Sequence, residues 1–328
     1  TVAEMTAITE EAAADPVEAV LEEDGRGRMK KMKKLVIILF SILIIVVGCS
    51  SKEDSNYTES GKMLVYASFY PLYFLADEIG GDNIDLRMVV PNGVDSHDYE
   101  PSMNQLKEIE NAYLFIYNGA NYESWADKVV GNIIDEKRTI NASQLVDLNV
   151  IDGNPDPHIW LNPDNMIQIG KAIKEKLVSL DEKNKDEYEK NFNELSDRLR
   201  ELDNRYFEVL KDKNKDSIIV SHAAFGYMTE RYGFNQIPVS GISPEQEPSP
   251  KTIANLIETA RNKNHEYIFL ETLASPKTVQ VIAEETNLQI LTLNPIEGLT
   301  EEQLKNGEDY ISLMEDNLEN LKKALVME

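Results

Sequence analysis

The chain has few of the residues that usually carry catalysis or cross-linking. Its 328 residues include one cysteine, two tryptophans and four histidines. Because Cys49 is the only cysteine, no internal disulfide can form, and the folded body has no thiol for a metal or for nucleophilic attack. The sequence contains neither a G-x-x-x-x-G-K-[ST] phosphate loop nor an H-E-x-x-H motif. The first absence argues against a P-loop ATPase and the second against the commonest type of zinc protease.

Positive charge is also scarce. The 58 acidic side chains outnumber the 33 lysines and arginines, which leaves a formal net charge of −25. A body this acidic repels nucleic acid and binds anionic lipid surfaces poorly. Diffuse negative charge attracts cations in general but cannot select one metal. Most of these carboxylates are explained by solubility.

Long apolar runs are missing except for one near the start. The basic stretch Met29–Lys34 precedes Leu35–Val47, which is apolar throughout except for Ser41. This run is shorter than the roughly 20 residues that a membrane-spanning helix needs. Residues 29–48 therefore indicate a cleaved secretory signal, with an uncleaved anchor as the alternative. The segment Val46-Val-Gly-Cys49 resembles the lipobox of bacterial lipoproteins, which implies acylation of Cys49 and attachment to a membrane.

The segments on either side of this signal are expected to lie outside the fold. Residues 1–28 are acidic and rich in alanine, and they precede a plausible start at Met29. We interpret them as an upstream extension, the alternative being an acidic cytoplasmic helix. Residues 49–62 are polar without apolar periodicity, which predicts a tether between the lipid and the domain.

The rest of the chain alternates short apolar strands with helices, and this pattern predicts parallel sheets covered by helices. We expect two α/β lobes, an N-terminal one at 63–180 and a C-terminal one at 214–328. The expected strands are 64–69, 84–90, 113–117, 217–220, 237–240, 267–271 and 289–293. The expected helices are 71–79, 104–110, 124–134, 163–180, 223–232, 250–263, 276–286 and 306–326.

One long helix is predicted between the lobes, at 181–213. Its apolar residues recur at alternating spacings of four and three, which places them on one face. They are Tyr188, Phe192, Leu195, Leu199, Leu202, Tyr206 and Val209. The spacing also suits a coiled-coil seam, but we interpret this helix as a rigid backbone that runs along both lobes.

Three of the four histidines lie in short segments that suggest a metal site. His97 and His158 lie in loops, and His222 follows a predicted strand, as does Glu271. Ligands bind open α/β sheets at the carboxyl ends of their strands. Two lobes facing each other would bring these four side chains into one cleft. Imidazole with carboxylate is a strong ligand set for zinc.

Four segments carry a resemblance to a known family. They are Asp-Ser-His-Asp-Tyr-Glu-Pro-Ser, Asp-Pro-His-Ile-Trp-Leu-Asn-Pro, Ser-His-Ala-Ala-Phe-Gly-Tyr and Ile-Ser-Pro-Glu-Gln-Glu-Pro-Ser. Together they resemble the zinc-binding lipoproteins of ABC transporters, in a cluster of metal-specific solute-binding proteins that also has manganese-binding members. The similarity runs from about Lys62 to Leu325. Two α/β lobes joined by a long rigid helix are what this resemblance implies.

The resemblance implies that His97, His158, His222 and Glu271 bind the metal. Three nitrogens and one oxygen suit four-coordinate Zn²⁺, while Mn²⁺, the alternative cargo, favours more carboxylate. Glu245 and Glu247 are candidates for orienting the ligating rings. Many zinc members carry a histidine-rich loop before the second histidine, and this sequence has none there.

The resemblance further implies a monomer, not an enzyme, anchored on the outer face of the cytoplasmic membrane. It would capture Zn²⁺ for an ABC permease with a cytoplasmic ATPase, and it would not bind nucleic acid. Two alternatives stay open. A zinc hydrolase would use the three histidines as ligands and Glu271 as general base. A surface adhesin would be an added role on the same scaffold.

Overall fold

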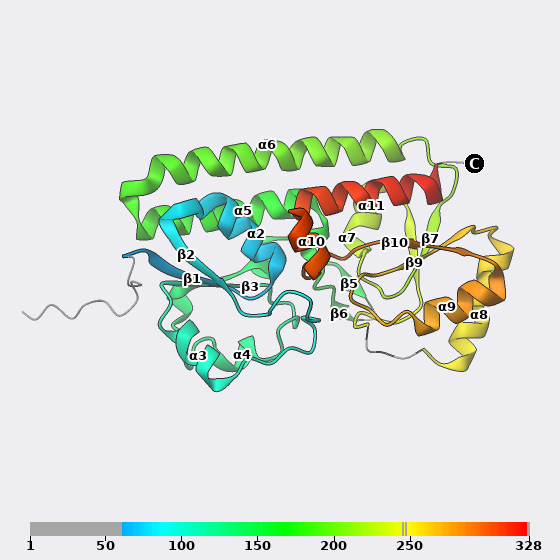
Figure 1. Ribbon diagram of the computed structural model, residues 1–328, viewed down its shortest axis with the longest axis horizontal. Coiled ribbons are helices and arrows are strands. Elements are labelled where there is room, and N and C mark those ends of the chain that lie inside the picture. The colour runs from blue at the N-terminus through cyan, green and yellow to red at the C-terminus, as the bar shows by residue number, and fades with distance from the viewer. Residues whose placement is uncertain (1–60, 152, 245, 247, 327–328) are drawn as a thin grey trace, which may run out of the picture. The chain divides into compact units, whose positions relative to one another are not determined.

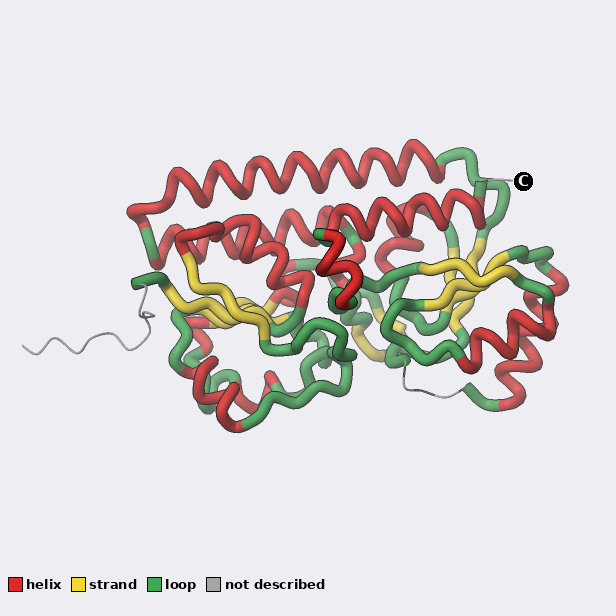
Figure 2. Tube along the Cα trace, viewed as in Figure 1, coloured by secondary structure: helices red, strands yellow, loops and turns green. Residues whose placement is uncertain are grey.

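The computed structural model of the protein describes residues 61–151, 153–244, 246 and 248–326. These residues belong to the unit Asn56–Glu328 of the chain. The unit contains two four-stranded parallel sheets with helices packed on them (Figures 1 and 2). The expected α/β class with two lobes and a long helix is confirmed. The extension at 1–28, the signal at 29–48 and Cys49 lie outside the described residues.

The N-terminal sheet has the strand order β2-β1-β3-β4, and all its neighbouring strands are parallel. Helices on its faces return the chain between the strands, as parallel pairing requires. Its strands are β1 (Met63–Ala67), β2 (Ile84–Met88), β3 (Leu114–Tyr117) and β4 (Thr139–Asn141), and its helices are α2 (Tyr70–Gly80), α3 (Met103–Glu110), α4 (Ala126–Val129) and α5 (Pro163–Leu180).

Two of these elements differ from the sequence-based expectation. The helix expected at 124–134 is only α4, because Gly131 takes a positive φ of 80° and Val130 pairs with Ile134 in a bridge. Strand β4, which has three residues, was not expected. It is too short for its alternation to stand out in the sequence, but it completes the sheet beside β3.

Helix α6 (Lys185–Leu210) packs against α2 and α5 of the N-terminal lobe and against α11 of the C-terminal lobe (Figure 1). Its predicted apolar stripe is largely buried, with Phe192 and Val209 only partly so. The stripe belongs to one continuous core that includes side chains of both sheets. The helix therefore connects the two lobes through shared packing as well as through the chain.

The C-terminal sheet has the order β10-β9-β7-β8, again with every neighbouring pair parallel. Its strands are β7 (Ser217–Val220), β8 (Asn235–Pro238), β9 (Tyr267–Leu270) and β10 (Gln289–Thr292), and its helices are α7 (Gly226–Tyr232), α8 (Pro250–Asn262), α9 (Lys277–Thr286), α10 (Glu301–Asn306) and α11 (Tyr310–Leu325). The final helix expected at 306–326 is α11, which begins later, at Tyr310, because Gly307 ends the unexpected helix α10 in the left-handed conformation and Asp309 caps α11.

A small antiparallel pair, β5 (Val150–Ile151) with β6 (Asn154–Pro155), leads from the N-terminal sheet into the loop that carries His158. In the part of the chain that the structure describes, no helix has the length and hydropathy needed to cross a membrane.

Candidate metal centre

His97 lies in the long loop that follows β2, and its backbone is fixed by a turn. The Oδ1 atom of Asp95 accepts the His97 backbone N–H at 2.9 Å. The ring packs edge-on against Tyr122, with centroids 4.7 Å apart. Its side chain keeps 8% exposure. His97 also lines a cavity of about 430 Å³, together with Tyr122, Asn154 and Pro157, so the cluster is open to that cavity through His97.

His158 lies in the loop between β6 and the short 3-10 turn at Ile159–Leu161, and it is fully buried. Asp156 holds it by a double contact. Its Oδ1 accepts the His158 backbone N–H at 3.0 Å and lies 2.8 Å from the ring Nδ1. The Nε1–H of Trp160 donates to the carbonyl of Pro295 at 2.6 Å, which ties this N-terminal loop to the C-terminal lobe.

His222 and Glu271 come from neighbouring parallel strands. His222 follows β7 and Glu271 follows β9, so both side chains lie at the carboxyl edge of the C-terminal sheet. Glu271 Oε1 lies 2.6 Å from the Nδ1 of His222 and accepts the His222 backbone N–H at 3.2 Å. It also accepts the hydroxyl of Ser221.

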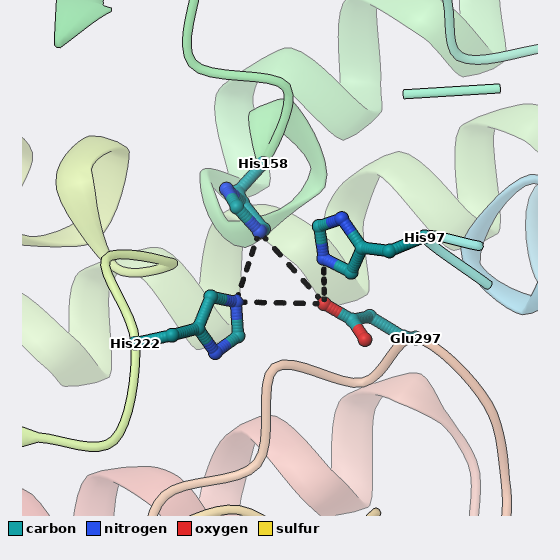
Figure 3. A group of neighbouring side chains, drawn as sticks. All are labelled: His97, His158, His222 and Glu297. Carbon is teal, nitrogen blue, oxygen red and sulfur yellow. Dashed lines mark hydrogen bonds and ion pairs between the residues drawn. The ribbon is translucent and has the colours of Figure 1, made fainter. Parts of the chain in front are cut away.

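The fourth member of the cluster is Glu297, which lies in the loop after β10. Its Oε1 lies 3.1 Å from the Nε2 of His97, 3.8 Å from that of His158 and 3.9 Å from that of His222 (Figure 3). The Nε2 atoms of His158 and His222 are 3.2 Å apart. One donor atom from each of the four residues lies within 4.8 Å of all the others.

The backbone before Glu297 is strained and tightly held. Ile296 has a φ of +59°, which is rare for a β-branched residue. Asn294 Oδ1 accepts the Ile296 backbone N–H at 2.8 Å, while the Asn317 side chain donates to the Asn294 carbonyl and accepts its N–H, both at 2.7 Å. Strain of this kind persists where the surroundings over-determine it, as they do here.

These distances suit a four-coordinate cation. Two ligands that each lie about 2.0–2.1 Å from a tetrahedral zinc ion are roughly 3.3–3.4 Å from each other. The four donor–donor distances given above, 3.1 to 3.9 Å, bracket that value. In addition, two ring nitrogens 3.2 Å apart repel each other if both present lone pairs, unless a proton or a cation lies between them. The donors are therefore close enough to hold a proton or a cation between them.

The electrostatics of the buried site agree with this arrangement. Burial would raise the pKa of Glu297, but the hydrogen bond with His97 and the charges of the three imidazoles lower it to about 2. Burial lowers the pKa of His158 well below its ordinary value, and the charges of His222 and His97 add to that effect. Burial also acts to lower the pKa of His222, but the Glu271 carboxylate outweighs it and raises that pKa.

The structure thus brings together three of the predicted residues, His97, His158 and His222, and differs for the fourth. Glu271 lies behind the His222 ring, on Nδ1, because its strand ends directly beside that of His222. Glu297 takes the place expected for Glu271. The sequence feature that could have indicated Glu297 is the Asn-Pro-Ile-Glu-Gly loop after an expected strand. Glu297 lies five residues beyond the end of β10, so it does not stand out as a residue at a strand end. Glu245 and Glu247 lie outside the described residues.

Two facing α/β lobes with three imidazoles and one carboxylate between them define a class of protein, a two-lobed binding protein with a site for a single cation. The family model for the periplasmic zinc-uptake complex component A, ZnuA, matches residues 65–324. The chain belongs to this family.

Relatives with known names agree. The high-affinity zinc uptake system protein ZnuA of Bacillus subtilis is 34% identical over 319 residues, which cover 91% of this chain and 99% of that protein. The zinc-binding lipoprotein AdcA of Streptococcus pneumoniae is 32% identical over 311 residues, which cover 89% of this chain. The chain spans only 61% of the length of AdcA.

Solved structures share the fold. The Zn(II)-bound ZnuA-like domain of S. pneumoniae AdcA superposes with a TM-score of 0.73 at 35% identity, covering 80% of this chain and 99% of that one. The laminin-binding protein Lmb of Streptococcus agalactiae, described as bifunctional with adhesin and metal-transporting activity, has a TM-score of 0.71 at 32% identity. This superposition covers 80% of this chain and 99% of Lmb.

Proposed function

We propose that this protein captures Zn²⁺ outside the cytoplasmic membrane and delivers it to an ABC permease. The observation that carries the proposal is the buried group of His97, His158, His222 and Glu297, which offers three nitrogens and one oxygen to one ion. Zinc is the cargo that this donor set suits best. The names of the relatives, one for zinc binding and one for zinc uptake, support the same cargo.

The two lobes have equal shares in this proposed site. Residues 63–180 form one metal-binding lobe and supply His97 and His158. Residues 214–328 form the other and supply His222 and Glu297, while residues 181–213 link the two. A site divided in this way couples the presence of the ion to the relative position of the lobes, which a membrane partner can recognise.

The location and partners follow from the same proposal. Lipidation of Cys49 would hold the protein on the outer face of the membrane, where it meets a permease whose ATPase lies inside. The lipoprotein name of the S. pneumoniae relative supports this anchor. We propose a monomer that binds no nucleic acid. An added adhesin role is suggested by the likeness to Lmb and is testable by binding to laminin.

Hydrolysis is the weaker candidate function. A catalytic zinc ion keeps one coordination position open for water, whereas the four side chains here would close a tetrahedral shell. The general base considered for a hydrolase, Glu271, accepts hydrogen bonds from Ser221 and His222. We therefore assign the protein a binding role without catalysis.

The test is a competition titration of the metal-free protein with Zn²⁺ and Mn²⁺ against a chelator. The proposal expects one tight Zn²⁺ site, weak Mn²⁺ binding and a large loss in His222→Ala. The matched control is His265→Ala, because His265 is the one histidine that is not in the cluster. Stronger retention of Mn²⁺ than of Zn²⁺ would change the assignment to a manganese importer. No tight site for either ion would refute the proposal.

A further inference from the structure

Two buried carboxylates lie directly behind the two most buried imidazoles. Asp156 has no exposed surface and Glu271 has 6% exposure. The Oδ1 atom of Asp156 lies 2.8 Å from the Nδ1 of His158, and the Oε1 atom of Glu271 lies 2.6 Å from the Nδ1 of His222. Each carboxylate also accepts the backbone N–H of the histidine that it contacts. The two contacts therefore have the same geometry in different lobes.

Burying these carboxylates is costly for the fold. A buried carboxylate normally needs a cationic partner, but among the described residues the ion pairs of Asp156 and Glu271 are with histidines alone. The space around Asp156 also depends on the residue type at position 226. A Cβ on Gly226 would lie 2.4 Å from Asp156 Oδ2, so the carboxylate fits because residue 226 is glycine. Such a cost indicates that the carboxylates have a role at the rings.

The role follows from what a carboxylate can do at an imidazole. An ionised carboxylate only accepts hydrogen bonds, so the Nδ1 atom that it contacts must carry the proton. The Nε2 atom of the same ring then carries a lone pair. In both residues Nε2 is the atom that faces the cluster (Figure 3). His97 differs, since the ring atom that contacts a carboxylate is Nε2, which lies 3.1 Å from Glu297 Oε1.

We propose that Asp156 and Glu271 are positioning residues, which hold His158 and His222 as Nδ1–H tautomers with both Nε2 lone pairs directed at the ion. This inference rests on the proposed zinc function and goes further, because it assigns the preorganisation of the site to two side chains that do not touch the metal. His97 has no such partner in the described part of the chain and is oriented by packing on Tyr122 and by Glu297.

The experiment uses Asp156→Asn and Glu271→Gln, which keep the shape of each side chain. An amide can turn its NH₂ group toward Nδ1, which then accepts, so the proton moves to Nε2 and blocks the metal. The matched control is Glu230→Gln, which removes the same charge from an exposed position on α7. If one variant fails to fold, the other still carries the test, because each carboxylate serves a different ring.

Two measurements are made on each protein. The first is Zn²⁺ affinity by chelator competition, where we expect a loss of about 10- to 100-fold in each variant and little change in the control. The second is the nitrogen NMR signature of the rings in the metal-free protein, in mildly alkaline buffer. We expect both His158 and His222 to carry a proton on Nδ1 in the wild type, whether or not a further proton lies between their two Nε2 atoms. Asp156→Asn should change only His158, and Glu271→Gln only His222.

The inference is overturned if both variants keep the affinity of the control, or if the ring tautomers are unchanged by the amides. Its failure is distinguishable from failure of the proposed function. A wild-type protein that binds no Zn²⁺ refutes the zinc assignment, while the ring signals of the metal-free protein still decide whether the carboxylates set the tautomers.

Discussion

The two sides of the metal centre are built differently. His158 and His222 are fully buried, and each has a carboxylate on its Nδ1. His97 is partly exposed, lines a cavity of about 430 Å³ and shares its Nε2 with Glu297. In the half formed by His158 and His222, the fold itself therefore orients both rings, through a carboxylate on each Nδ1. In the other half, the His97 ring contacts Tyr122 and Glu297 and has no carboxylate on Nδ1 among the described residues.

Removing a metal ligand should cause the largest loss of Zn²⁺ affinity. The size of the loss should also differ between the two sides of the site. We expect His158→Ala and His222→Ala to lose more Zn²⁺ affinity than the roughly 100-fold limit for an orienting residue. His97→Ala should lose less than either, since its ring is the least fixed. Chelator competition measures all three, with His265→Ala as the control. An equal or larger loss of affinity in His97→Ala would contradict the proposed difference between the two sides.

Removing the metal should lower stability by the free energy that binding supplies. A ligand that binds only the folded state at 100 times its Kd stabilises it by about 2.7 kcal/mol. We expect Zn²⁺ to raise the midpoint of thermal unfolding and a chelator to reverse the change. The rise in the unfolding midpoint that Zn²⁺ causes should be almost absent in His222→Ala. An equal increment in that variant would mean that the ion stabilises another site.

A single methyl group should disturb the His158 side alone. In Gly226→Ala the new Cβ would lie 2.4 Å from Asp156 Oδ2, so the carboxylate or α7 must move. We expect destabilisation of about 1–3 kcal/mol, the usual cost of overpacking, measured by denaturant unfolding. The ring signal of His158 should shift while that of His222 stays. Unchanged stability and unchanged signals would show that the space around Asp156 is less restricted than the contacts indicate.

Per pH unit, the dependence of Zn²⁺ affinity on pH should be the smallest effect, and it should separate the two buried rings. Burial opposes protonation of His222, but Glu271 raises its pKa, whereas the pKa of His158 is lowered. A histidine must be neutral to bind zinc, so protons compete as the pH falls through the raised pKa of His222. We expect affinity to fall by at most about tenfold per pH unit between about pH 8 and pH 5. A flat profile would contradict the raised pKa.

Much of the fold was predictable because hydrophobic periodicity is a local property. The stripe on α6, the apolar strands and the prolines that open α5 and α8 follow from spacing and backbone chemistry. Failures occurred where a few residues decide the conformation. Strand β4 is too short for a pattern, and α4 ends early because of the backbone around Gly131.

The class of fold, the two lobes and the three histidines as candidate ligands could be predicted from the sequence, because strands, helices and rare residue types are visible in short segments. The choice between two glutamates that both follow strands needed the folded structure. Glu271 ends its strand beside His222 and is held by Nδ1, while the strained loop at Ile296 returns Glu297 to the three Nε2 atoms. Which carboxylate faces the ion depends on loop geometry and on contacts between distant segments, and spacing along the chain does not encode these.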